Sequence, residues 1–162
     1  MPEKETVDRA RKDAREGKSP STQAGEFVRE EIHHVREGKH GARSPQQAIA
    51  IGLSKARRAG VNLPPPADPE LREKAKRDLS KGRAARKEKP SVKRSRAITG
   101  ALKREGRAAA SRKSLAKQTR KAARERGAAA RHRAGIKAVK TKGKTGLKRA
   151  AQKAARTRRR AA

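Results

Sequence analysis

The densest run of bulky apolar residues in the chain has the spacing of an amphipathic helix. In residues 44–60, SPQQAIAIGLSKARRAG, apolar positions recur at i, i+3, i+4 and i+7, and both Ile49 and Leu53 fall on the apolar side. The pair Ser44-Pro45 is a typical helix start, and Gly60 can end the helix in the left-handed conformation. The pattern predicts one short helix. Because so short a helix is unstable alone in water, it also predicts a packing partner.

The segment directly upstream is the predicted partner. Residues 19–38 begin with a second serine–proline pair, carry an apolar stripe and end at a glycine. Two such helices with a short connection form an αα-hairpin. Phe27 is the only aromatic residue of the chain, so it can fill the space between the two helices. The predicted hairpin core consists of Phe27, Val28, Ile32, Val35, Ile49 and Leu53.

Prolines and glycines punctuate the rest of the chain. Leu63-Pro64-Pro65-Pro66 predicts a stiff, extended spacer, and Asp68-Pro69 predicts the capped start of another helix. Helices are expected at 3–16, 68–81, 91–105 and 108–126, with glycine breaks at 135, 143 and 146. The predicted organisation is an N-terminal charged helix at 1–18, the hairpin module at 19–63, a Pro-rich linker at 64–69, a second, weaker helical unit at 70–127 and a basic tail at 128–162.

Three short motifs indicate an internal duplication. KDAREGK, VREGK and KARRAG in the first half resemble RDLSKGR, KREGR and AARERG in the second half, in the same order and 65 to 68 residues later. The apolar stripe of the second copy has thinned to Val92, Ile98, Leu102 and Leu115, so we expect it to bury less area and to be less stable. The predicted fold class is mainly α, a helical hairpin or three-helix unit in degenerate duplicate, with no β-sheet.

Composition limits the size of the folded part. Of 162 residues only 31% are hydrophobic and 1% aromatic, which is too little for a globular core of that length. The chain has no cysteine, so it has no disulfide, no thiolate nucleophile and no Cys-type zinc site. No apolar run approaches the roughly 20 residues of a membrane span, and the mixed-charge start MPEKETVDRARKDAREG is no secretory signal. A cytoplasmic protein, located at the nucleoid, is expected.

Positive charge is concentrated in the second part of the chain. Residues 1–66 contain 13 Lys+Arg and 9 Asp+Glu, whereas residues 67–162 contain 35 and 7, with no acidic residue after Glu125. Uncompensated like charges repel, so the tail is expected to be disordered or conditionally helical until a polyanion binds. The candidate nucleic-acid-binding residues are Arg107, Arg112, Lys113, Lys117, Arg120, Lys121, Arg124, Arg126, Arg131, Arg133, Lys137, Lys140, Lys142, Lys144, Lys148, Arg149, Lys153, Arg156, Arg158, Arg159 and Arg160.

These cations predict a non-enzymatic, sequence-independent nucleic-acid-binding protein of the nucleoid-associated, histone-like type. Lys and Arg bind phosphates without reading bases. Single-strand binders usually add aromatic platforms, which this chain lacks, so duplex DNA is the preferred partner. Folded or ribosomal RNA is the alternative. A further alternative is an adaptor whose hairpin binds a protein partner or forms a homodimer, since its apolar stripes are wide. No membrane partner is expected, because the tail has Ala where an interfacial helix carries Leu, Phe or Trp.

Two Glu-x-x-His spacings are the strongest candidate for metal chemistry. Glu30 with His33 and Glu31 with His34 have the spacing used in helix-bundle metal sites, and His40 follows closely. Such sites need carboxylates from a facing helix, and residues 44–60 contain none. The histidines are therefore interpreted as surface residues, and no metal ligand or cofactor is predicted. No nucleophile elbow and no phosphate-binding glycine loop occurs, which favours a non-enzymatic protein.

Residues 47–60, QAIAIGLSKARRAG, resemble the signature of a family of small, very basic bacterial proteins of unknown function. The preceding GEFVREEIHHVREGKHGARS is similar to a subset of the same family. Some members carry labels such as plasmid stabilisation or DNA-binding protein, so the resemblance implies such a role. The tail is similar to the Ala/Lys/Arg-rich tails of linker-histone-like proteins, but it has fewer prolines and no Ser-Pro-Lys-Lys motif.

Overall fold

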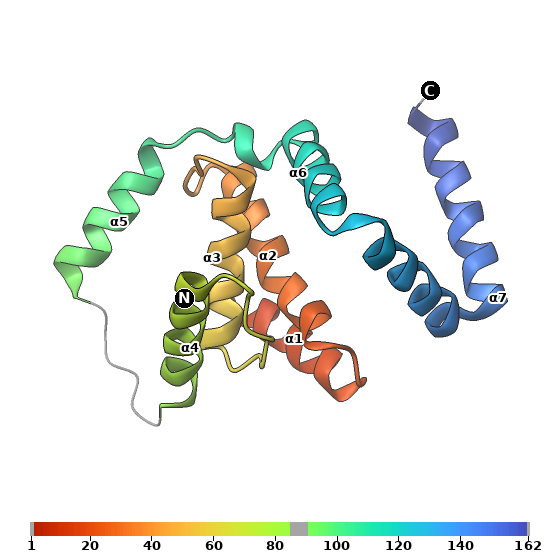
Figure 1. The fold of residues 1–162 in the computed structure, drawn as a ribbon. Coiled ribbons are helices and arrows are strands. Elements are labelled where there is room, and N and C mark those ends of the chain that lie inside the picture. Colours follow the sequence, from red (N-terminus) through yellow and green to blue (C-terminus); the bar gives the residue numbers. More distant parts are fainter. Residues whose placement is uncertain (1, 85–90, 162) are drawn as a thin grey trace. The chain divides into compact units, whose positions relative to one another are not determined.

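The computed structural model describes residues 2–84 and 91–161, and every regular element in these ranges is a helix (Figure 1). The chain forms two compact units, residues 1–118 and residues 119–162. The mainly α class is therefore confirmed, and the described ranges contain no strand. The elements are α1 (Lys4–Arg15), α2 (Pro20–Glu37), α3 (Pro45–Arg58), α4 (Pro69–Arg83), α5 (Val92–Arg104), the 3-10 helix η1 (Ala108–Ala110), α6 (Arg112–Glu125) and α7 (Gly127–Ala161).

The helices α2 and α3 form the predicted hairpin. Gly38 ends α2 in the left-handed conformation with φ 78°, and the Ser44 side chain accepts a hydrogen bond from the backbone N–H of Gln47, which caps α3. The two helices approach closely at Gly52, where an added Cβ would lie 2.7 Å from the Cα of Val28. This contact requires glycine, so the small residue inside α3 sets the distance between the helices.

The first core cluster lies where α1 crosses the hairpin. Phe27 is fully buried, and the partly buried side chains of Val7 and Leu53 pack beside it. Val61, which follows α3, and Leu63, the first residue of the spacer, close the end of the hairpin as part of the same cluster. The buried members are Ala10, Ala24, Phe27, Ala56, Val61 and Leu63. The aromatic ring of Phe27 is thus the largest buried side chain of a core that alanine, valine and leucine residues complete.

A second cluster joins the hairpin to a segment far along the chain. Ile32 and Val35 of α2 are buried together with Ala109 and Ala110 of η1, and Leu115 of α6 packs against them. The Arg36 side chain donates a hydrogen bond to the carbonyl of Ala110 (2.9 Å). Because these partners lie about 75 residues apart in sequence, periodicity within either segment gave no indication of the contact.

The loop between α2 and α3 takes part in the same junction. The N–H of Gly41 donates to the carbonyl of Leu102 (2.8 Å), and the N–H of Ala42 donates to the carbonyl of Gly106 (3.0 Å). A Cβ at Gly41 would overlap the backbone carbonyl of Glu105. Gly41 is therefore required for the close approach of two backbone segments, and the loop holds residues 102–110 in place.

The other side of α3 is covered by α4. Asp68 caps α4, because its side chain accepts a hydrogen bond from the N–H of Leu71. Farther along α4, the Asp78 carboxylate accepts from Ser54 Oγ (2.7 Å) and from Arg58 Nε (2.8 Å). The apolar stripes that suggested a protein partner are thus covered by α1, α4 and η1 of the chain itself.

The expected second core is not formed among the described residues. Helix α5 buries none of its residues, and the side chains of Val92 and Ile98 are exposed. Leu115 packs against the hairpin cluster instead. The expected helix 108–126 is also divided, because Ala108–Ala110 form a 3-10 turn and the Ser111 side chain accepts a hydrogen bond from the N–H of Ser114. Four bulky aliphatic residues spread over residues 92–115 supply too little apolar area to fold alone.

The second unit consists of the end of α6 and of α7. Gly127 separates the two helices with φ 72°, and Gly143 interrupts α7 with φ 62° and ψ 176°. Gly135 and Gly146 lie within helical stretches, so the breaks expected there are wrong. A single interior glycine costs a helix only about 1 kcal/mol relative to alanine, and alanine-rich neighbours offset this. The structure shows a helix in this region, so the expected disorder of the tail is not confirmed.

Candidate functional site

All 21 candidate cations of residues 107–160 are exposed in the structure. In α6, four of them recur at i, i+4, i+7 and i+11, which places them on one side of the helix. The half-buried Leu115 and Ala122 lie on the opposite side. We call this set the α6 stripe; it consists of Lys113, Lys117, Arg120 and Arg124.

Helix α7 repeats the same spacing on each side of its kink. Before Gly143, the residues Arg133, Lys137 and Lys140 occur at i, i+4 and i+7. After the kink, four cations at i, i+4, i+7 and i+11 span about 16 Å at 1.5 Å rise per residue. This second set, the α7 stripe, consists of Arg149, Lys153, Arg156 and Arg160. The stripes can be read from the residue spacing in the sequence, but not from the overall charge.

Carboxylates offset the charge of the first helices but not that of α7. In α1 and α2, Arg9 pairs with Glu26 at 2.7 Å and with Glu5 at 3.6 Å. In α6, Glu125 lies 3.8 Å from Lys121. Beyond Glu125 the sequence offers no Asp or Glu at all, so the cations of α7 have no acidic side chain of their own segment to pair with. The stripes are therefore open to external anions.

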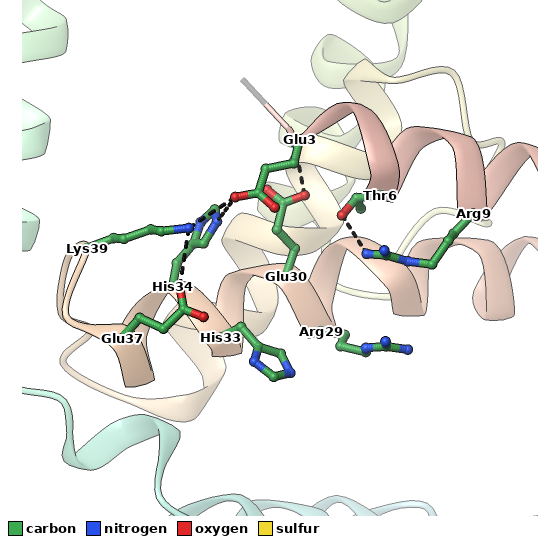
Figure 2. A pocket seen from close by; sticks show the side chains of 9 residues that line it. All are labelled: Glu3, Thr6, Arg9, Arg29, Glu30, His33, His34, Glu37 and Lys39. Atoms are coloured by element: carbon green, nitrogen blue, oxygen red, sulfur yellow. Dashed lines mark hydrogen bonds and ion pairs between the residues drawn. The ribbon is translucent and has the colours of Figure 1, made fainter.

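A separate polar cluster is buried inside the hairpin. The side chains of Glu30 and Glu31 on α2 are 2% and 1% exposed, and both face Lys55 of α3. Lys55 Nζ lies 3.3 Å from Glu30 Oε1 and 2.6 Å from Glu31 Oε2. The backbone N–H of Glu3 also donates to Glu30 Oε2 (3.1 Å), at the polar pocket shown in Figure 2. The pair of buried carboxylates thus shares one ammonium group.

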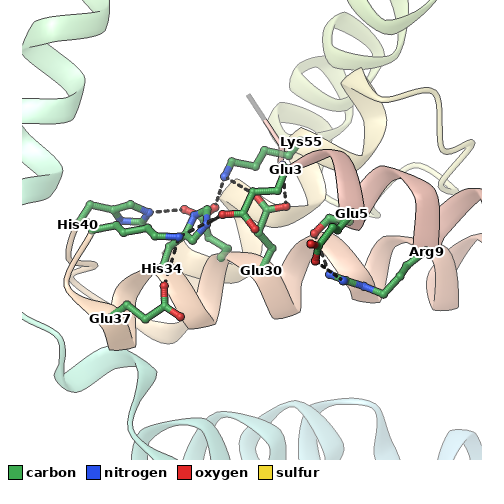
Figure 3. A network of polar contacts seen from close by, with 11 residues as sticks. Glu3, Glu5, Arg9, Glu30, His34, Glu37, His40 and Lys55 are labelled. Carbon is green, nitrogen blue, oxygen red and sulfur yellow. Dashed lines mark hydrogen bonds and ion pairs between the residues drawn. The ribbon is translucent and has the colours of Figure 1, made fainter.

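Two histidines extend this cluster (Figure 3). His40 Nε2 lies 2.9 Å from Glu31 Oε1, and His34 Nε2 lies 2.9 Å from Glu3 Oε1. Hydrogen bonds from His34 and then from Lys39 lower the pKa of Glu3 to about 2. The same contact with Glu3 raises the pKa of Lys39. One ligand atom from each of Glu31, His34 and His40 lies within 4.8 Å of the others.

The structure corrects the interpretation of these histidines as surface residues. The side chains of His34 and His40 are only 12% and 15% exposed, whereas His33 is exposed. Of the two Glu-x-x-His spacings, the structure brings together Glu31 and His34. Glu31 occupies a core position, four residues from both Phe27 and Val35, and that position in the apolar stripe was the signal for a buried carboxylate.

The structure buries part of the predicted hairpin core fully and part of it only half. Phe27, Ile32 and Val35 are buried, whereas Val28, Ile49 and Leu53 are half-buried. Lys55 of α3, which is not among the predicted core residues, binds Glu30 and Glu31. No helix of the described ranges has both the length and the apolar character needed to cross a membrane.

The fold and charge distribution define a class of protein, a basic helical protein with a packed hairpin and cation-striped helices. Residues 20–66, which comprise α2, α3 and the spacer, match the model of a family described as a family of unknown function (DUF6496). The matched region is the hairpin and includes Glu30, Glu31 and Lys55 of the buried polar cluster. Comparison with curated proteins and with solved structures found no match.

Proposed function

We propose that the protein binds the phosphate backbone of duplex nucleic acid, preferentially DNA, through the cation stripes of α6 and α7. The observation that carries the proposal is the repeated i, i+4, i+7 spacing of exposed Lys and Arg on three helical segments, in a region with no acidic residue after Glu125. The low acidic content leaves these cations available to phosphates. The protein acts without catalysis, as a nucleoid-associated protein.

The stripe geometry suits a duplex. Double-stranded DNA carries one charge per about 1.7 Å of axis, so a stripe of about 16 Å lies beside roughly ten phosphates. Four cations on one side of a straight helix can then contact phosphates together. The stripes contain no aromatic residue on which unpaired bases could stack, which favours a duplex over a single strand. Backbone contacts of this kind carry no sequence information.

The test compares stripe cations with an equal number of cations outside the stripes. One variant replaces Lys113, Lys117, Arg120 and Arg124 with Gln, and a second replaces Arg149, Lys153, Arg156 and Arg160 with Gln. The matched control replaces Arg126, Arg131, Lys142 and Arg158 with Gln, which removes the same charge. Affinity for a random-sequence duplex is measured from about 50 to 200 mM salt, a range over which phosphate contacts make the affinity fall steeply.

Each stripe variant is expected to reduce the slope of log affinity against log salt by roughly 3 to 4, because about 0.9 is lost per phosphate contact. The control is expected to reduce it less. Equal reductions in all three variants would show that total charge, not the stripe, determines binding. Unchanged affinity in all three would overturn the proposal.

Folded RNA is the second candidate, because its backbone presents the same phosphates. Arginine-rich segments bind structured RNA as well as DNA. Crosslinking in cells followed by recovery of the bound nucleic acid separates the two. Predominant recovery of RNA would replace DNA as the target and leave the role of the stripes intact.

A further inference from the structure

We propose that Glu31, His34 and His40 form a binding site for one divalent transition-metal ion, with Zn²⁺ as the probe. Two imidazoles and one carboxylate are an established donor set for zinc, which accepts three protein ligands and a water. The ligand atoms of the three residues already lie within 4.8 Å of one another. The site lies within the first unit and is independent of the cation stripes.

The two histidines are held as metal-bound histidines usually are. A ligating imidazole normally donates its other N–H to a carbonyl or a carboxylate, which fixes the ring. His40 Nδ1 lies 3.0 Å from the carbonyl of Gly41, and His34 Nε2 lies 2.9 Å from Glu3 Oε1. Both rings therefore have an oxygen partner that orients them, and Glu3 acts as a positioning residue.

The contact between His40 and Glu31 indicates a missing positive charge. A carbonyl only accepts hydrogen bonds, so His40 Nδ1 carries the proton that faces Gly41. In a neutral ring the lone pair of Nε2 then faces Glu31 Oε1 at 2.9 Å, and two acceptors at this distance repel each other. A cation between these atoms removes the repulsion, and a second proton on the ring is the competing explanation.

Glu31 provides an independent indication. Its Oε2 atom is fully buried and contacts Lys55 Nζ at 2.6 Å, which leaves Oε1 to face His40 Nε2 at 2.9 Å. Lys55 also contacts Glu30 Oε1, so it keeps a partner when Glu31 binds a metal. Three carboxylates of the cluster, those of Glu3, Glu30 and Glu31, face two ammonium groups, those of Lys39 and Lys55. The excess negative charge favours an added cation.

The position of the site gives it a structural consequence. His40 lies next to Gly41 and Ala42, whose N–H groups donate hydrogen bonds to the carbonyls of Leu102 and Gly106. A metal that fixes His40 against α2 also fixes this loop and the junction with residues 102–110. The expected result of zinc binding is a higher midpoint of thermal unfolding, because a ligand that binds only the folded state stabilises it.

The experiment uses the full chain after chelator treatment, titrated with ZnCl₂ by calorimetry and with Co²⁺ by visible absorption. Unmodified protein is expected to bind one Zn²⁺ per chain. His34→Ala and His40→Ala are each expected to weaken binding beyond the roughly 10- to 100-fold that loss of an outer-shell partner costs, and Glu3→Gln by roughly 10-fold. The matched control, His33→Ala, removes an exposed imidazole of the same helix and is expected to leave the affinity unchanged.

Circular dichroism establishes that each variant is folded, and Glu3→Gln, at an exposed residue, serves where a histidine variant does not fold. Absence of Zn²⁺ binding by the unmodified protein overturns the proposal and assigns the missing charge to a second proton on His40. Equal loss of affinity in His33→Ala and His40→Ala also overturns it. Duplex binding is measured in the same samples, so that failure of this site and failure of the cation stripes are distinguished.

Discussion

Helices α2 and α7 are both long, but different interactions support them. In α2, six residues are buried, including the carboxylates of Glu30 and Glu31. In α7, none of residues 127–160 is buried, and 13 cations face no Asp or Glu of the same helix. Helix α2 is thus stabilised by tertiary packing, whereas α7 depends on the high helix propensity of Ala, Lys and Arg against like-charge repulsion. A bound polyanion therefore affects α7 far more than α2.

The largest difference in stability between the two regions is expected at Phe27. Phe27→Ala is expected to lower the free energy of unfolding of the first unit by about 3 to 5 kcal/mol, because it removes the largest fully buried side chain of that core. The matched control, Val139→Ala in α7, is expected to change it by less than about 0.5 kcal/mol, because that side chain is exposed. Urea unfolding measures both, and equal effects would contradict the assignment of the core.

Substitution of Lys55 measures how much the buried charges of α2 contribute to the free energy of unfolding. Lys55→Met leaves Glu30 and Glu31 buried without their ammonium partner, and the expected loss in free energy of unfolding is about 3 kcal/mol. Adding Glu30→Gln and Glu31→Gln to this variant should recover part of the loss, because no uncompensated charge is then buried. The measurement is urea unfolding in the presence of a chelator, so that no metal replaces the ammonium.

The control for Lys55→Met is Lys12→Met on α1. The Lys12–Glu16 ion pair is 3.9 Å long and exposed, so its loss is expected to leave the free energy of unfolding nearly unchanged. If Lys55→Met costs no more than this control, the buried cluster does not contribute to stability.

Deletion of residues 127–162 should weaken duplex binding and leave the stability of the first unit unchanged. It removes 13 of the 21 candidate cations, so duplex affinity should fall by about 100-fold or more at low salt, alike for all sequences. The urea unfolding midpoint of the first unit should stay unchanged, since none of residues 127–160 is buried. Binding is measured on several unrelated duplexes, and a loss confined to one of them contradicts backbone recognition.

The sequence predicted the hairpin well and the long-range junction not at all. Ser44, Gly38 and Asp68 are local signals, and each stands at the helix end where the sequence placed it. The contact of Ala109 and Ala110 with α2 depends on chain segments about 75 residues apart, and alanine in a basic segment gives no pattern that identifies its partner. The duplication hypothesis overestimated the burial of Val92 and Ile98 for the same reason, since similar short motifs do not specify similar burial.

The buried cluster was predicted only in part. The sequence spacing pairs Glu31 with His34, but helical periodicity indicates only α3 as the facing element, and α3 has no carboxylate. The loop residue His40 completes the group instead, because the turn after Gly38 brings it back over α2. A loop conformation set by glycine and by distant hydrogen bonds is not encoded in helical periodicity.

The last prediction concerns the helix of the second unit itself. Residues 119–162 contain 17 Lys+Arg and one Asp+Glu, and helix formation brings these cations closer together. In dilute buffer the isolated segment should therefore show less helix by circular dichroism than the α-helical state seen in the structure, and added duplex should raise its helicity. Salt at 1 M, which screens charges beyond about 3 Å, should also raise helicity without duplex while abolishing binding, since counterion release then contributes little. Helicity and binding thus respond to salt in opposite directions. A segment that is fully helical at low salt and indifferent to duplex would show that α7 is a preformed structure, and folding would then have no part in recognition.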